Sequence, residues 1–193
     1  MTVALQSAIQ RNGLTQGDLV RFLENVRDLV NQLRTGLATT LQGNYLLSTP
    51  GLGIGSTPDL VANIAFQYSI GGVVYNKAAV AAGTAPGNDV IPQGTYGACA
   101  FDIGVDGTID AIEATGNATG YASAALAAAG LPAPATGHAR MGYVTATKSD
   151  GAFTFDTTNL NASNTTVAYT EGTTLFDALT AGVTESSLTL SKG

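Results

Sequence analysis

One repeat near the start of the chain constrains the fold more than any other feature. Over residues 15–42, large apolar side chains recur at intervals of three or four, the period of an amphipathic α-helix. Thr15 and Asp18 predict the helix start, as an N-cap and an acid in the first turn. Gly43 predicts the stop, although Gly36 offers an earlier one. The repeat consists of Leu19, Leu23, Val26, Val30, Leu33, Leu37 and Leu41.

The same repeat predicts how the helix is used. Its spacing is close to the a/d pattern of a coiled coil, and Phe22 and Leu29 widen the apolar stripe. A wide stripe suits packing against more than one neighbour, in a trimer of identical chains or against the chain's own domain. We expect a homotrimer, with an oligomer interface formed by Leu23, Val26, Val30, Leu33 and Leu37.

The segment 44–59 has the composition of an extended arm or linker. Gly, Pro, Ser and Thr dominate residues 48–58, and this composition disfavours a helix. An extended arm offers its apolar side chains to a neighbouring subunit or packs them on its own domain, and both readings stay open here. The prediction adopted is a contact with another subunit made by Leu46, Leu47, Leu52 and Ile54.

Beyond this arm the hydrophobic period changes to two. Residues 64–70 alternate between apolar and smaller or polar side chains, and β-branched and aromatic residues concentrate in further short runs. The pairs Asp106-Gly107 and Asp150-Gly151 lie between such runs and predict tight hairpins. A short Ala-rich helix is expected at 121–129. The further strand candidates are 73–75, 96–105, 141–147, 153–155 and 166–169.

These patterns together predict a mainly β fold, a β-sandwich or barrel, with a long N-terminal α-helix and an extended arm. A chain of 193 residues is long enough for one such domain with an appendage. The expected division is an N-terminal helical segment at 1–43, an extended arm at 44–59 and a β-rich domain with a short helical insertion at 60–193.

Composition removes several classes of function. The net charge is −6, with 8 basic and 14 acidic residues, which argues against a protein that needs a basic surface for nucleic-acid phosphates. The lone Cys99 and the lone His138 exclude a disulfide framework and zinc cages of the usual Cys/His types. Neither a secretory signal nor a continuous apolar helix stands out, so we expect synthesis in a cytoplasm and no membrane partner.

The segment 102–113 matches the spacing of an EF-hand calcium loop at several positions, with Asp102, Asp106, Asp110 and Glu113 as oxygen donors. The match is incomplete because Gly104 occupies a ligand position and the flanking residues have strand and loop patterns instead of helical ones. We therefore expect a plain Asp-Gly hairpin with outward-facing acids and no metal, with calcium binding as the open alternative.

Candidate catalytic residues are few. His138 and Arg140 suggest a base beside an anion clamp, and Ser123 suggests a nucleophile, but no catalytic or phosphate-binding motif surrounds them. Cys99 lies in a strand pattern between two alanines, where a small buried hydrophobe is expected. The prediction is a protein that is not an enzyme, with no catalytic residues and no cofactor.

Three stretches, 94–110, 120–132 and 138–155, carry a resemblance to tailed-bacteriophage virion proteins. The chain is most similar to the auxiliary head proteins called cement or decoration proteins, and the likeness covers the last two thirds of the sequence. This resemblance implies a non-enzymatic trimer on the capsid surface that binds the major capsid protein lattice, without direct contact to nucleic acid. The alternative is a head or tail fibre module that binds a host receptor or glycan.

Overall fold

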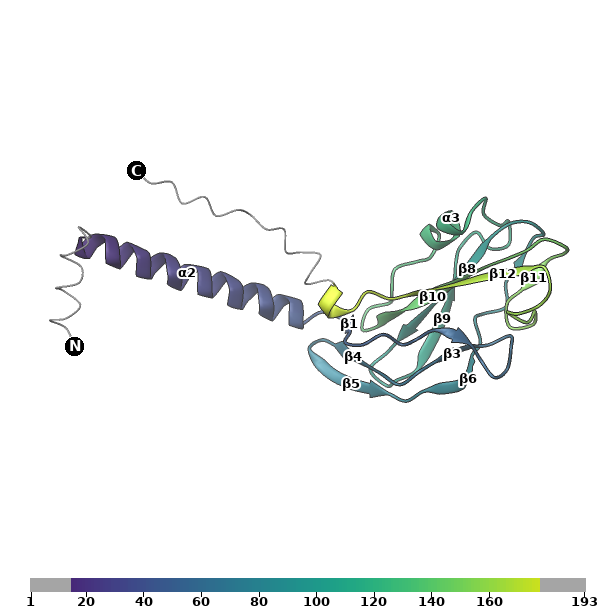
Figure 1. The fold of residues 1–193 in the computed structure, drawn as a ribbon, viewed down its shortest axis with the longest axis horizontal. Helices are drawn as coiled ribbons and strands as arrows, with labels where there is room; N and C mark the ends of the chain where they lie inside the picture. The colour runs from purple at the N-terminus through teal and green to yellow at the C-terminus, as the bar shows by residue number, and fades with distance from the viewer. Residues whose placement is uncertain (1–14, 178–193) are drawn as a thin grey trace. The chain divides into compact units, whose positions relative to one another are not determined.

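The computed structural model describes residues 15–177, with the side chains of that range except those of residue 19 and residues 34–41. The chain divides into two compact units, Met1–Gln42 and Gly43–Gly193 (Figure 1). The predicted arm at 44–59 thus belongs to the second unit. No helix among the described residues is both long and apolar enough to cross a bilayer.

The first unit contains helix α2, Gln16–Leu41, a helix of 26 residues. Thr15 and Asp18 form a reciprocal cap at its start: the Thr15 backbone N–H donates to the Asp18 carboxylate at 2.9 Å, and the Asp18 N–H donates to the Thr15 hydroxyl at 3.2 Å. The Thr15 hydroxyl and the Thr15 backbone N–H both donate to the Asp18 carboxylate, and these two hydrogen bonds hold the pKa of Asp18 below its usual value. The predicted N-terminal helix is confirmed, including its start.

The second unit is built on a four-stranded antiparallel sheet with the order β12-β10-β8-β9. Strand β10 is the longest and pairs with β8 on one side and β12 on the other. A short helix, α3, follows β9 in the chain (Figure 1). The bounds are β8 Gly97–Ile103, β9 Ile109–Glu113, α3 Ala124–Ala129, β10 Ala139–Lys148 and β12 Thr165–Glu171.

Three smaller antiparallel sheets complete this unit, with the orders β1-β4-β5, β2-β3-β6 and β11-β7. Strands β1 and β2 lie in the segment predicted as an arm. The bounds are β1 Tyr45–Leu46, β2 Gly53–Ile54, β3 Val61–Asn63, β4 Phe66–Ile70, β5 Val73–Lys77, β6 Val80–Thr84, β7 Val90–Ile91 and β11 Phe153–Thr154.

The prediction of a mainly β chain with an N-terminal helix is confirmed. Each of the sheets found in residues 15–177 is small and has two edge strands, so none of them closes into a barrel. The barrel alternative therefore does not describe this part of the chain.

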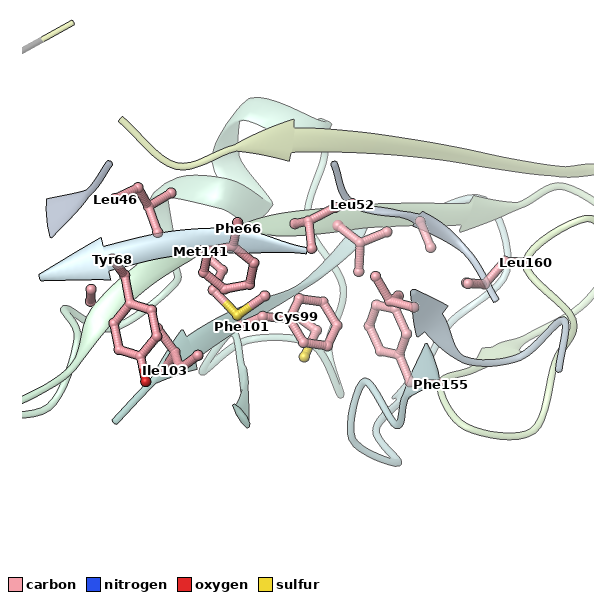
Figure 2. Close-up of a cluster of buried hydrophobic side chains, with 14 of the residues drawn as sticks. Leu46, Leu52, Phe66, Tyr68, Cys99, Phe101, Ile103, Met141, Phe155 and Leu160 are labelled. Atoms are coloured by element: carbon pink, nitrogen blue, oxygen red, sulfur yellow. The ribbon is translucent and has the colours of Figure 1, made fainter. Parts of the chain in front are cut away.

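The main core combines side chains from separate sheets in one buried cluster (Figure 2). Phe66 and Tyr68 of β4 belong to it, together with Phe101 and Ile103 of β8 and Met141 of β10. The Tyr68 hydroxyl donates to the backbone carbonyl of Gly104 at 3.0 Å, so this buried aromatic ring also satisfies its polar atom.

The opposite face of β8 is covered as well, which explains why all seven of its residues are buried. Ala98 packs in a second small cluster with Ala127 of α3, where small side chains allow the helix to approach the sheet. Asn117 is fully buried beside them. Its side-chain amide donates to the Ala98 carbonyl and accepts from the Ala98 N–H, both at 2.9 Å, and so replaces a missing strand partner.

One of the two predicted hairpins is confirmed and the other is wrong. Asp106-Gly107 joins β8 to β9, with Gly107 at a φ of 76° and the Asp106 carboxylate accepting from the Thr108 N–H at 2.9 Å. Asp150-Gly151 joins β10 to β11, but these strands do not pair, because β10 pairs with β12 and β11 with β7.

Candidate functional site

Exposed apolar side chains form a stripe on α2 within residues 20–33. Of the five predicted interface residues, Leu23 is 56% exposed, Val26 40%, Val30 53% and Leu33 64%. The side chain of Leu37 lies outside the described residues. Val20, Phe22 and Leu29 are exposed beside them. Contiguous exposed apolar surface of this kind marks an interaction site.

Helix α2 has little besides its stripe to stabilise it. Every described side chain between residues 15 and 33 is exposed, and the ion pair between Arg27 and Asp28 is a surface pair at 3.6 Å. Such surface pairs contribute about 0–1 kcal/mol. Asn25 and Asn31 are poor helix formers, and a glycine such as Gly36 costs about 1 kcal/mol relative to alanine inside a helix. Most helical stability in proteins comes from packing of an apolar face, and none of the side chains described between residues 15 and 33 is buried.

The four predicted contact residues of the segment 44–59 separate into two kinds. Leu46 and Leu52 are 1% and 9% exposed and belong to the core of the second unit, which is the alternative that the sequence left open for them. Leu47 is half-buried, and Ile54 is 42% exposed. For these two, a contact with another subunit stays a prediction.

Hydrogen bonds fasten this segment to its own unit. The Leu52 N–H donates to the Glu171 carboxylate at 2.7 Å, and partial burial raises the pKa of that carboxyl. The Asn44 side-chain amide donates to the His138 carbonyl at 3.1 Å and accepts from the Gly71 N–H at 3.0 Å. The segment is therefore structural and does not hang free as a linker.

A groove of about 670 Å³ opens on the second unit. It draws on four separate stretches of the chain, which is why periodicity in the sequence did not reveal it. Its lining combines apolar and aromatic side chains with several polar ones, as the lining of small-molecule sites does. Among its lining residues are Asn44, Tyr45, His138, Arg140, Tyr143 and Glu171.

Arg140 is held in this groove by a buried acid. Its guanidinium forms an ion pair with Asp102, whose side chain is fully buried, and its second terminal nitrogen also donates to the Pro132 carbonyl at 2.7 Å. The Arg140 side chain remains 21% exposed. A guanidinium fixed in this way presents its remaining N–H groups in one orientation.

The predicted acidic loop at 102–113 is a hairpin and has no helices on either side. Asp102 faces Arg140, Asp110 lies 3.1 Å from the His138 ring, and Asp106 accepts two hydrogen bonds from Thr108. Glu113 accepts a hydrogen bond from the Asp89 N–H, so each of the four acids has its own partner. The expectation that the acids face outward is wrong for Asp102, which is fully buried against Arg140. No cluster of three or more His, Cys, Asp or Glu side chains suited to a metal is found within residues 15–177.

The residues considered for catalysis lie in ordinary structural roles. Ser123 is the N-cap of α3 and accepts from the Leu126 N–H at 3.3 Å. His138 pairs with Asp110, and its other ring nitrogen lies 3.2 Å from the Thr136 carbonyl. Cys99 is fully buried, as expected, and its burial raises the pKa of the thiol far above its usual value.

Comparison of the chain with known protein families finds no matching family. Comparison with curated proteins finds no match either. Comparison with solved structures likewise finds no match. The case for a function therefore rests on the residues and their geometry.

Proposed function

We propose that this chain is a non-enzymatic structural protein of a tailed-phage virion, a cement or decoration subunit that binds the major capsid protein lattice and stabilises it. In this proposal three copies associate through the stripe on α2, and the trimer sits on the outer surface of the capsid. The sequence resemblance to cement proteins supplies the class, and the exposed stripe supplies the means of association.

The observation that carries the proposal is the contrast between a β unit with a buried core and a helix whose large apolar side chains, where the structure describes them, are all exposed. Leu23, Val26, Val30 and Leu33 lie along one stripe, and each is at least 40% exposed. A trimer that touches several capsid subunits at once gains avidity from every contact, so each contact can be weak. Because such a trimer binds only the assembled lattice, it shifts the equilibrium toward the intact shell.

The second unit supplies a rigid body for this role. We infer that it is a β-sandwich, because side chains of β4 and of β8 and β10 meet in one buried cluster. Charged residues are only 11% of the chain, against about 25% in typical globular proteins. Short hydroxyl and amide side chains then cover much of the surface, as in proteins that pack against neighbours in an assembly.

The rupture temperature of capsids tests this proposal. Capsids assembled without the protein are heated with and without the purified chain, and release of their DNA is followed by dye fluorescence. We expect the chain to raise the rupture temperature. The double variant Val26→Asp with Leu33→Asp serves as a control, because a monomer with the same β unit loses avidity and stabilises less. An unchanged rupture temperature with the trimeric wild-type protein would exclude the cement role.

The groove favours a second candidate, a fibre module that binds a host glycan. Tyr45 and Tyr143 offer aromatic rings on which sugars stack, and Arg140 and Glu171 offer hydrogen bonds. This module would leave the capsid rupture temperature unchanged and would bind immobilised host glycans, with binding lost in Tyr143→Ala. Copy number separates the two further, since a cement subunit is present in many copies per particle and a fibre in few.

A further inference from the structure

The stripe on α2 also contains information on how the copies are oriented. Its intervals place Leu23 and Val30 at a positions and Val26 and Leu33 at d positions of a heptad repeat. The flanking positions are unlike each other. Between residues 16 and 33, position g holds Phe22 and Leu29, whereas position e holds Val20 and Arg27.

The acids of α2 avoid this surface. Asp18, Glu24 and Asp28 fall at the outward positions c, b and f, so no acid occupies e or g between residues 16 and 33. Arg27 therefore has no acidic partner at the flank of a packed helix. Among the described residues, Arg27 forms an ion pair with Asp28 of the same helix, an exposed contact at 3.6 Å.

Parallel and antiparallel packing of α2 place Arg27 against different neighbours. In a parallel coiled coil the g residue of one helix lies against the e residue of the next heptad on its neighbour, which brings Phe22 against Arg27. In an antiparallel pair, e residues face e residues. Because Arg27 is close to the middle of the helix Gln16–Leu41, symmetric antiparallel packing would bring two Arg27 side chains together.

We propose that copies of α2 associate in parallel, with Arg27 of each copy packed on Phe22 of the next. This inference rests on the trimer of the proposed function and adds its geometry. The aliphatic stem of Arg27 covers the aromatic ring, while the guanidinium reaches water and interacts with the ring face. Antiparallel packing instead juxtaposes like charges and leaves Phe22 without this cover.

The width of the apolar face favours three copies over two. The a/d pairs do not decide between them, because Leu23 at a with Val26 at d reverses the order that favours two-stranded coils, whereas Val30 at a with Leu33 at d has that order. Apolar g residues widen the face of each helix, as a three-helix bundle requires.

Parallel packing has a consequence for the capsid role. The second unit begins at Gly43, directly after the C-terminal end of α2 at Leu41. In a parallel bundle, all three β units therefore emerge from the same end. The trimer then presents equivalent β units to a threefold arrangement of capsid subunits.

Distances between spin labels test the orientation. Arg21→Cys and Asp28→Cys place a label at the same outward heptad position, f, and leave the stripe intact. Native Cys99 is fully buried and does not take up the label. In parallel packing, both variants give the same single distance between chains. In symmetric antiparallel packing, the labels at Asp28 stay close along the axis, whereas those at Arg21 separate by about 22 Å at 1.5 Å per residue.

The outcomes distinguish this inference from the proposed function. Equal distances at both sites support parallel packing. A longer or second distance at Arg21, together with a trimer mass by light scattering, overturns the orientation and leaves the trimer. Absence of any distance between chains at both sites, together with a monomer mass, overturns the trimer and the orientation with it.

A second test asks whether removing the charge of Arg27 weakens or tightens trimer association. We expect Arg27→Gln to weaken trimer association several-fold, because the cover on Phe22 loses its charge and part of its length. The matched control Arg21→Gln, which removes the same charge from an outward position, leaves association unchanged. If Arg27→Gln tightens association instead, arginines face one another in the wild type, and parallel packing is wrong. Dissociation constants come from sedimentation equilibrium.

Discussion

Large apolar side chains are buried in the second unit of this chain and exposed on α2 in the first. In the second unit, Phe101 of β8 is 1% exposed and packs in a cluster that joins several sheets. In α2, Leu33 is 64% exposed, and its neighbours in the stripe are exposed with it. The β unit therefore has a buried core of its own, whereas we expect the stability of the helix to depend on a partner that binds its stripe. The same kind of substitution should have different consequences in the two places.

The largest expected effect comes from charges in the stripe. The double variant Val26→Asp with Leu33→Asp places two carboxylates per chain in the seam of the trimer, where unpaired charges are costly to bury. We expect a monomer at micromolar concentration by light scattering, with a large loss of helical circular dichroism, since an isolated α2 is marginal. Urea unfolding of the β unit should remain unchanged.

The matched control carries the same change of charge on the outer face. Asn25→Asp with Asn31→Asp adds two carboxylates per chain at outward positions of the same helix, and we expect the wild-type mass. A double stripe variant that remains a trimer would show that these residues do not form the interface. A shifted β-unit transition would show that the stripe supports the chain's own domain, the other reading that the sequence allowed.

The next largest effect is expected in the β unit, where the substituted side chain is buried. Phe101→Ala removes a buried ring from the core and should lower the free energy of unfolding of the β unit by about 3–5 kcal/mol. The mass of the trimer should stay unchanged under native conditions. Val74→Ala on β5, at a side chain that is 57% exposed, should change stability by less than about 0.5 kcal/mol. Similar losses in the two variants would contradict the burial difference between these positions.

Local signals were enough to predict α2 and the hairpin at 106–107. The helix start depends on Thr15 and Asp18, which are three residues apart, and the hairpin depends on Asp106 and Gly107 with the strands beside them. In both cases, the residues that make the structure are neighbours in the sequence. Periodicity and turn chemistry report such contacts directly.

Non-local pairing explains the failures. Asp150-Gly151 has the chemistry of a hairpin, but β10 finds a better partner in the seven-residue β12 than in the two-residue β11. The segment 44–59 reads as a linker, yet Leu46 and Leu52 are drawn into a core whose other members lie far along the chain. The groove was missed for the same reason. No local pattern specifies which distant residues will meet.

A smaller effect tests the cap of α2 through pH. The Thr15 hydrogen bonds lower the pKa of Asp18 from about 3.8, so its contribution to helix stability is present above that pH and is lost as the pH falls below it. We expect wild-type helical circular dichroism to fall more steeply on acidification than that of Asp18→Asn, which still caps but does not titrate. If the helical circular dichroism of the two proteins falls equally on acidification, the pKa of Asp18 is the same in the folded helix and in the unfolded chain.

The smallest expected effect has the opposite sign and belongs to the β unit. Partial burial raises the pKa of Glu171 above about 4.5, so the folded unit binds this proton more tightly than the unfolded chain. Its contribution to stability is therefore present below that pH and is lost as the pH rises through the pKa of the folded unit.

The variant Glu171→Gln keeps an oxygen that accepts from the Leu52 N–H and removes the charge. We expect its urea stability, relative to wild type, to improve as the pH rises from about 4 to about 7, with Asp59→Asn as a control for the loss of one negative charge. If the wild type instead becomes more stable relative to Glu171→Gln over that range, the hydrogen bond from the Leu52 N–H affects the pKa of Glu171 more than burial does. Acid then destabilises both units of the chain.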